Sequence, residues 1–267
     1  MNNKLAALCV VTICAMAAPA LHAQQPAAGN ASPQTPAAAA APAKPKPRAW
    51  HGTLNAGIGL ADGVQAQKGY QLSAGLKRPF SDGGSFVAQA QRQYQKVTFP
   101  NEALTADRTN FAVGVDQDFT PHFIGMARSM YLRDQLMYVD SRYEQLIGAG
   151  VNLFDAKKRF SFQFVPGVSI YKQNLKYSDD DSWQSGGGFY EKLTGKLNEK
   201  WSIENSFRYR RNFSDPDHSV ESVASLQGMI TKTLGMQMEY QYNYESIVPP
   251  DFPHYLQVLS AGLRFQF

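Results

Sequence analysis

Apolar and polar residues alternate along most of the sequence after Trp50. The clearest case is the C-terminal segment, where one parity holds Leu259, Ala261, Leu263, Phe265 and Phe267 and the other holds Ser260, Gly262, Arg264 and Gln266. A period of two residues indicates a β-strand with one apolar face and one polar face. The same alternation recurs in residues 236–245, 201–213 and 160–170.

Turn signals divide residues 50–267 into about twelve such segments. One set of connections is short: 81–84, 120–122, 155–158, 198–200 and 233–235. A second set alternates with it, is mostly longer and is rich in Pro, Asp and Ser: 100–105, 134–138, 178–182, 214–218 and 248–253. Short turns at one end and longer polar loops at the other are typical of a membrane β-barrel. Ten or fourteen strands remain alternatives, because alternation is weak around Gly186–Gly188 and in 124–133. We expect those glycines to mark a bend or bulge in a strand.

The composition of the two faces decides between a soluble barrel and a membrane barrel. The polar face is mostly Gln, Ser, Asn, Gly and Thr, whereas a water-exposed surface would be dense in Lys and Glu. Aromatic residues also gather at both ends of the strands, as they do at the two interfaces of a bilayer. The first group is Phe80, Phe119, Phe154, Phe160, Trp201 and Phe267, and the second is Phe99, Tyr131, Tyr138, Trp183, Phe213 and Tyr255. We therefore predict an all-β, antiparallel transmembrane β-barrel over 50–267, with twelve strands most favoured.

The N-terminal 49 residues have a different character. Residues 1–23 combine Lys4, an apolar run and a small-residue cleavage sequence ending at Ala23, which predicts a secretory signal peptide. Residues 24–49 contain ten alanines, six prolines and no acidic residue, which predicts a disordered periplasmic linker. Both cysteines, Cys9 and Cys14, lie in the predicted signal peptide, so no disulfide is expected in the mature chain. Export to the cell outer membrane is the expected localisation.

Charge argues against a nucleic-acid partner. Four of the 26 basic residues precede Trp50, which leaves 22 basic residues against 22 acidic ones in the predicted barrel. A formally neutral domain lacks the basic footprint of a nucleic-acid-binding protein. The expected partners are outer-membrane lipid and lipopolysaccharide, and the sequence does not indicate an oligomeric state.

The C-terminal residues resemble a known recognition signal. Gly262, Phe265 and the terminal Phe267 match the pattern by which Gram-negative outer-membrane barrels are read by the barrel-assembly machinery, which is therefore an expected partner. The two phenylalanines share the apolar face, and Gly262 offers a flat backbone for pairing with another strand edge.

Two further stretches resemble the salt-induced outer-membrane proteins, a family of unknown function numbered 481. The first runs from Tyr131-Leu132-Arg133-Asp134 through Asp140-Ser141-Arg142-Tyr143 and Gly148-Ala149-Gly150 into 160–171. The second is Tyr242-Asn243-Tyr244-Glu245-Ser246 with Pro249-Pro250, ahead of the closing strand. The resemblance covers most of 50–267 and implies an outer-membrane barrel with no established activity. It supplies no catalytic residue.

Several charged residues have the parity of the polar face and are candidates for lining the lumen: Asp140, Arg142, Glu144, Glu204, Arg208, Arg210 and Glu239. They would either form a constriction that selects ions by charge or form salt bridges that plug the lumen and hold strands in register, the second being favoured. Arg133 shares the lumen only if Ile124, Arg128 and Leu132 face lipid, and the sequence leaves that strand undecided.

No constellation for catalysis, cofactor binding or metal binding is predicted. His218 lies beside Asp215, Asp217 and Ser219, and it offers the alternative of an outer-membrane lipid or peptide hydrolase with a site at the barrel rim. Neighbours on one loop rarely align a base with a nucleophile, however. Asp179-Asp180-Asp181 is more consistent with a solvated loop than with a cation site. The sequence thus predicts a non-enzymatic barrel that acts as a narrow pore or as a structural element of the envelope.

Overall fold

The computed structural model of the protein describes residues 49–62, 67–80, 83–98, 103–135, 137–154, 158–176, 182–248 and 254–267. The predicted signal peptide and all of the predicted linker except Ala49 lie outside these residues, as does the aspartate run at 179–181. Within the described part of the chain, no helix has the length and hydrophobicity needed to cross a bilayer.

Twelve β-strands form the described structure, as the alternation predicts. They are β1 (His51–Asp62), β2 (Gln67–Pro79), β3 (Gly84–Thr98), β4 (Ala103–Thr120), β5 (Phe123–Asp134), β6 (Val139–Phe154), β7 (Phe160–Leu175), β8 (Trp183–Lys196), β9 (Trp201–Asn212), β10 (His218–Met229), β11 (Leu234–Glu245) and β12 (Tyr255–Gln266).

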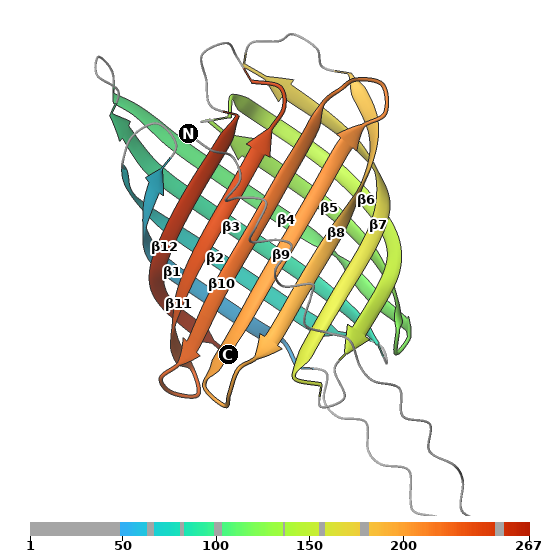
Figure 1. Cartoon of the computed structure of the whole chain (residues 1–267), viewed down its shortest axis with the longest axis vertical. Helices are drawn as coiled ribbons and strands as arrows, with labels where there is room; N and C mark the ends of the chain where they lie inside the picture. The colour runs from blue at the N-terminus through green and yellow to red at the C-terminus, as the bar shows by residue number, and fades with distance from the viewer. Residues whose placement is uncertain are drawn as a thin grey trace, which may run out of the picture. The chain divides into compact units, whose positions relative to one another are not determined.

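The strands make a single closed antiparallel barrel (Figure 1). Each strand pairs with its neighbours in the chain, and β1 pairs with β12 to close the ring. Gly57 lies opposite Gly262 in this closing pair. Closure matters because a sheet without a free edge pairs its backbone N–H and C=O groups internally, which is the requirement for crossing hydrocarbon.

The two ends of the barrel differ in their connections. At one end the connections run from two residues between β4 and β5 to five between β6 and β7, and Phe267 lies at this end (Figure 1). At the other end they reach seven residues between β7 and β8 and nine between β11 and β12. We call these the short-connection end and the long-connection end.

The outer surface of the barrel is apolar. Ile58 and Ile147 are 77% and 67% exposed, although each lies in the middle of a strand. Exposed aromatic residues mark the ends: Phe119 and Phe267 at the short-connection end, and Trp183 and Phe213 at the long-connection end. An apolar wall between two aromatic girdles is the surface of a transmembrane barrel rather than of a soluble one.

The interior is mainly polar but has one apolar region. Ile124, Met126 and Val165 are buried together inside the wall, packed by Leu146 and Tyr190. The inner face of β5 therefore carries Ile124 and Leu132, both buried. This arrangement resolves the strand that the sequence left undecided: the odd residues of β5, including the half-exposed Arg133, face outward.

Register shifts interrupt the alternation at a few points. They occur between Asp118 and Thr120 and between Leu132 and Asp134, and a third separates Val139 from Ser141. Of the bend or bulge expected at Gly186–Gly188, the bulge is not found, because β8 pairs with β7 and β9 there without a shift. A Cβ atom at Gly188 would lie 1.9 Å from the carbonyl oxygen of Tyr209, so close backbone approach explains that glycine instead.

Candidate functional site: an ion-pair cluster across the lumen

Alternation places the charged residues of the site on the inner face. Arg142 and Glu144 lie near the start of β6, and Arg208 and Arg210 near the end of β9. Because adjacent strands are antiparallel, these positions meet at the long-connection end. We call the group formed there the lumen cluster; it consists of Arg108, Asp134, Arg142, Glu144, Tyr171, Arg208, Arg210, Asp217, Glu221 and Glu245.

Several ion pairs of the lumen cluster cross the barrel interior. Arg142 Nη1 on β6 lies 2.8 Å from Glu245 Oε1 on β11, five strands away around the ring. Arg108 Nη2 on β4 lies 3.0 Å from Glu221 Oε1 on β10, which is the opposite strand. These contacts therefore join walls that share no backbone hydrogen bonds.

Arg208 links three strands. Its guanidinium donates to Glu144 on β6 and also lies 3.4 Å from Glu221 Oε2 on the adjacent β10. Glu221 thus accepts from Arg208 through one oxygen and from Arg108 through the other. A carboxylate shared between two guanidinium groups is a charge-assisted contact, which is stronger than a neutral hydrogen bond.

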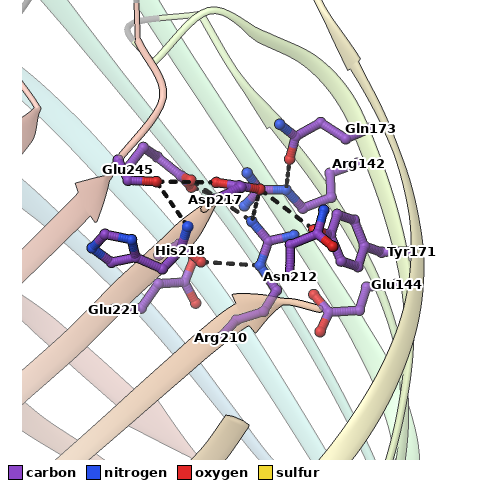
Figure 2. Close-up of polar contacts among 12 residues, drawn as sticks. Arg142, Glu144, Tyr171, Gln173, Arg210, Asn212, Asp217, His218, Glu221 and Glu245 are labelled. Carbon is purple, nitrogen blue, oxygen red and sulfur yellow. Dashed lines mark hydrogen bonds and ion pairs between the residues drawn. The ribbon is translucent and has the colours of Figure 1, made fainter. Parts of the chain in front are cut away.

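Arg210 forms the second half of the cluster (Figure 2). Its Nη2 lies 3.4 Å from Asp217 Oδ2 and 3.8 Å from Glu245 Oε2. Its guanidinium carbon also lies 4.2 Å from the centroid of the Tyr171 ring, a cation–π distance. The Tyr171 hydroxyl donates to Asp217 at 3.4 Å, and the tyrosine is completely buried.

Supporting contacts hold these side chains in place. Arg142 Nε donates to Gln173 on β7, and Arg210 Nε donates to Ser219 at 3.1 Å. Ser246 Oγ donates to Asp217 Oδ1 at 3.3 Å. Asp134 lies 3.6 Å from Arg108 and accepts the backbone N–H of Met137 at 3.1 Å, which ties the cluster to the β5–β6 connection.

The cluster extends across the interior at the long-connection end. A small cavity remains among Asn110, Met130, Leu132, Arg142, Glu144, Arg208 and Glu221. The cluster holds four arginines and five carboxylates, so its formal charge is −1. Burying an isolated charge costs a large desolvation free energy. Because positive and negative charges are nearly equal in number here, each buried ion has a partner of opposite charge.

The remaining inner charges form separate contacts. Glu239 accepts hydrogen bonds from Gln71 and Gln237 at 2.6 Å each and from Gln241 at 2.5 Å. Glu204 pairs with Lys192 at 2.9 Å on the neighbouring strand. The cluster thus gathers Arg142, Glu144, Arg208 and Arg210 from the seven candidate residues, while Glu204 and Glu239 lie elsewhere on the inner face.

Asp140 lies apart from the other candidates. The register shift between Val139 and Ser141 inverts the alternation, so Val139 is buried at 1% exposure while the Asp140 side chain is 54% exposed. Its carboxylate lies 3.9 Å from Arg133, which is also half-exposed. Parity counted back from Arg142 could not detect this shift.

His218 lies against aromatic rings rather than against an acid. Its imidazole is 6.3 Å from the Tyr209 ring and 5.5 Å from the Tyr244 ring, with Nδ1 3.1 Å from the carbonyl oxygen of Pro216. The adjacent Asp217 carboxylate contacts Arg210, Tyr171 and Ser246. The described structure therefore brings no carboxylate or serine to the His218 ring. Within the same residues, no three His, Cys, Asp or Glu side chains are placed to hold a metal ion.

The C-terminal residues lie at the closing pair. Phe265 and Phe267 are exposed on the outer surface at 46% and 67%. Phe267 exchanges two backbone hydrogen bonds with Gly52, at 2.8 and 3.0 Å. A Cβ atom at Gly262 would lie 2.0 Å from the carbonyl oxygen of Ala56, so β1 can approach β12 this closely only because residue 262 is glycine.

Sequence reasoning grouped Asp134 with Arg133, Asp140 and Arg142, but it did not single out Arg108, Tyr171 or Glu221. Each follows the inner parity of its strand, so the available signal was a charged or aromatic residue near the long-connection end. Tyr171 looked like one of many aromatic residues of an apolar strand. Its parity, opposite to that of the outward-facing Val168 and Ile170, was the one signal that it faces inward.

Fold and interior together define a transmembrane β-barrel of the type found in bacterial outer membranes, with buried ion pairs across its lumen. The family model for proteins of unknown function DUF481 matches residues 54–267, and the chain belongs to this family. No curated protein matches the chain.

Solved structures with a similar fold include a porin and an outer membrane channel. The NanC porin is 13% identical and aligns over 79% of this chain and 98% of its own with a TM-score of 0.53. The COG4313 outer membrane channel from Pseudomonas putida F1 is 10% identical and aligns over 82% of this chain and 96% of its own with a TM-score of 0.52. At these identities the likeness establishes the fold alone.

Proposed function

We propose that the protein is a narrow outer-membrane pore whose lumen is closed by the lumen cluster. The observation that carries the proposal is the pair of ion contacts that cross the interior, Arg108–Glu221 and Arg142–Glu245. Separating an ion pair costs little net free energy when water and dissolved ions then solvate its two charges. Ion pairs can therefore close a hydrated passage reversibly.

Unsatisfied guanidinium N–H groups in the cluster support a pore over an inert plug. Arg108 Nη1, Arg142 Nη2 and Arg210 Nη1 have no hydrogen-bond acceptor among the described residues although they are buried. A buried guanidinium N–H needs an acceptor, and in a polar interior that acceptor is water. Water bound at these three arginines would give ions a hydrated path when the pairs separate.

A structural role for the barrel in the envelope is the second candidate. The inner apolar group of Ile124, Met126 and Val165, packed by Leu146 and Tyr190, favours it because such packing fills space without serving a passage. The two candidates differ in one measurable respect, which is whether the lumen conducts.

Single-channel current separates them. We would refold the mature barrel, insert it into a planar bilayer and record at high salt, then repeat with Arg142→Ser and with Arg208→Ser. Discrete current steps that grow with these substitutions are the expected result. A folded barrel that stays silent in all three forms would reject the pore and leave the structural role.

Location and partners belong to the same proposal. The aromatic girdles and the exposed Phe265 and Phe267 support insertion into the outer membrane by the barrel-assembly machinery, with lipopolysaccharide around the long-connection end. Cleavage after Ala23 is tested by N-terminal sequencing of the barrel isolated from membranes. The salt-induced type implied by the family resemblance stays a prediction, which protein levels in cells grown with added NaCl would check.

A further inference from the structure

An ionisable residue lies on the outer surface of the barrel wall. Glu191 on β8 is paired in register with Phe164 on β7 and Phe207 on β9. The neighbouring residues Tyr190 and Lys192 face inward, since Tyr190 packs on the inner apolar group and Lys192 pairs with Glu204. Side chains alternate along a strand, so Glu191 points outward.

The surroundings of Glu191 are apolar. Phe189, the next outward residue of β8, lies 5.6 Å from the Phe164 ring and 5.7 Å from the Phe207 ring, measured between centroids. No hydrogen bond or ion pair joins the Glu191 carboxylate to a residue in the described ranges. It therefore presents an unpaired acid to whatever lies outside the wall.

Glu191 lies at the depth of the hydrocarbon core of the membrane. Glu191 lies five residues before Lys196, at the short-connection end of β8, and eight residues after Trp183, which is 62% exposed at the other end. At about 3.3 Å per residue and a strand tilt of roughly 40°, it lies about 13 Å along the membrane normal from the end of its strand. A transmembrane barrel has an apolar band about 25 Å tall, so Glu191 is near its middle.

A polar amide accompanies the acid at the same depth. Asn205 on β9 pairs with Leu193 on β8 and Ala224 on β10, and it alternates with the inward-facing Glu204. It lies four residues from the short-connection end of β9, compared with five for Glu191 on β8. The wall thus carries a hydrogen-bond acceptor and a donor side by side, where lipid tails can satisfy neither.

We propose that this wall, β8 to β10, is the contact surface between two copies of the chain in the membrane. A two-fold axis along the membrane normal between Glu191 and Asn205 brings the Glu191 carboxylate of one copy against the Asn205 amide of the other, and the reverse. An isologous contact of this kind requires that one patch complement itself, and a donor next to an acceptor meets that requirement. Ala224 beside Asn205 gives the wall a small outward residue that permits close approach.

Complementarity favours a second copy over other occupants. Acyl chains offer no donor, and lipopolysaccharide phosphates lie at the surface of the membrane, away from mid-depth. A different protein would need its own donor and acceptor in matching positions, whereas a second copy has both by symmetry.

The test measures the mass of the full-length chain after extraction into detergent. We expect a dimer. Glu191→Leu and Asn205→Leu should each raise the dimer dissociation constant about tenfold, because each removes one or two hydrogen bonds between the copies. Glu191→Gln, which keeps an acceptor, should retain the dimer. Gln145→Leu is the matched control, because Gln145 is also polar and outward-facing but lies on β6, where it bonds Ser129 at 2.8 Å.

Cross-linking in intact membranes gives a second readout. Ala224→Cys should yield a disulfide-linked dimer, while Ile147→Cys, on the outer surface of β6, should not. The chain without an added cysteine is the reference, since Cys9 and Cys14 are its only thiols. Heat-dependent migration on a gel reports folding of each variant independently of dimer formation. A folded wild-type monomer that does not cross-link at 224, or a dimer that survives both leucine substitutions unchanged, would overturn the proposal.

Discussion

Arg108 and Glu221 lie 3.0 Å apart although their strands, β4 and β10, stand on opposite sides of a twelve-strand ring. Neither side chain could reach so far if the interior were a wide channel. Both extend toward the barrel axis, and Arg208 joins them there through the second oxygen of Glu221. Ion pairs thus connect opposite strands across the lumen, in addition to the backbone hydrogen bonds that connect adjacent strands around the wall.

Removing the Arg108–Glu221 ion pair should widen the path for ions through the lumen. We expect the double substitution Arg108→Ser with Glu221→Ser to give larger current steps than the wild-type barrel, because both long side chains leave the axis and the formal charge of the cluster stays the same. Single-channel recording in planar bilayers measures the effect. Arg128→Ser is the control, since Arg128 pairs with Asp116 at 2.5 Å on the adjacent strand and its loss leaves the axis unchanged. Equal currents from the two variants would count against a gate at Arg108 and Glu221.

Breaking one side of the buried pair Arg142–Glu245 should destabilise the barrel. Both side chains are at most 10% exposed, so Arg142→Ala leaves a buried carboxylate facing fewer cations. We expect a loss of about 3–5 kcal/mol in the free energy of unfolding, measured by urea titration in detergent. Arg142→Met combined with Glu245→Leu should recover much of it.

The exposed pair Arg133–Asp140 supplies the comparison for that measurement. Its side chains are 46% and 54% exposed and 3.9 Å apart. Arg133→Ala should therefore change the unfolding free energy by less than about 1 kcal/mol. Similar losses for Arg133→Ala and Arg142→Ala would show that burial does not govern these ion pairs.

Salt should favour the open state of the pore. The Debye length falls from about 10 Å at 0.1 M to about 3 Å at 1 M, so added salt weakens ion pairs that water can reach. We expect the fraction of time spent conducting to rise between 0.1 and 1 M KCl, beyond the rise in bulk conductivity that scales the step size. In the variant lacking Arg108 and Glu221 this fraction should depend less on salt. An open fraction independent of KCl in the wild type would contradict an electrostatic closure.

Closure of the barrel should depend on the glycine at position 262. Gly262→Leu places a side chain where a Cβ atom already lies 2.0 Å from the Ala56 carbonyl oxygen, so β12 cannot pair with β1. We expect loss of the compact, heat-modifiable band after refolding. Gly59→Ala on the same seam is the control, because its Cβ atom would meet its nearest neighbour, Val258 Cγ1, at an ordinary 3.5 Å. Normal folding of Gly262→Leu would show that the seam tolerates separation.

The fold was predictable because strand periodicity is a local property. Five consecutive alternations between Met236 and Glu245 specify a strand and its faces without reference to the rest of the chain. β5 was the exception, because Ile124 and Leu132 face inward while Phe123 and Tyr131 face outward, so both of its faces carry large apolar residues. Only pairing with neighbouring strands distinguishes them.

The site was predictable only in part. Parity placed Arg142, Glu144, Arg208 and Arg210 on the inner face, and the structure brings those four together. Their partners could not be derived, because whether Arg108 meets Glu221 depends on how far each strand is displaced along its neighbours around the whole ring. Asp140 shows the converse problem, since one extra residue at a bulge reverses parity without a sequence signal.

The order of strands around the ring also bears on how the barrel assembles. Each hairpin joins strands that follow one another in the chain, so its loop-closure entropy is small and it can form early. The β1–β12 pair instead unites segments about two hundred residues apart. Until β12 has been synthesised and docked, β1 remains an open edge with unpaired backbone groups. Docking of β12 is therefore the step that ends exposure to aggregation, which places a kinetic checkpoint of the barrel at the formation of the β1–β12 pair.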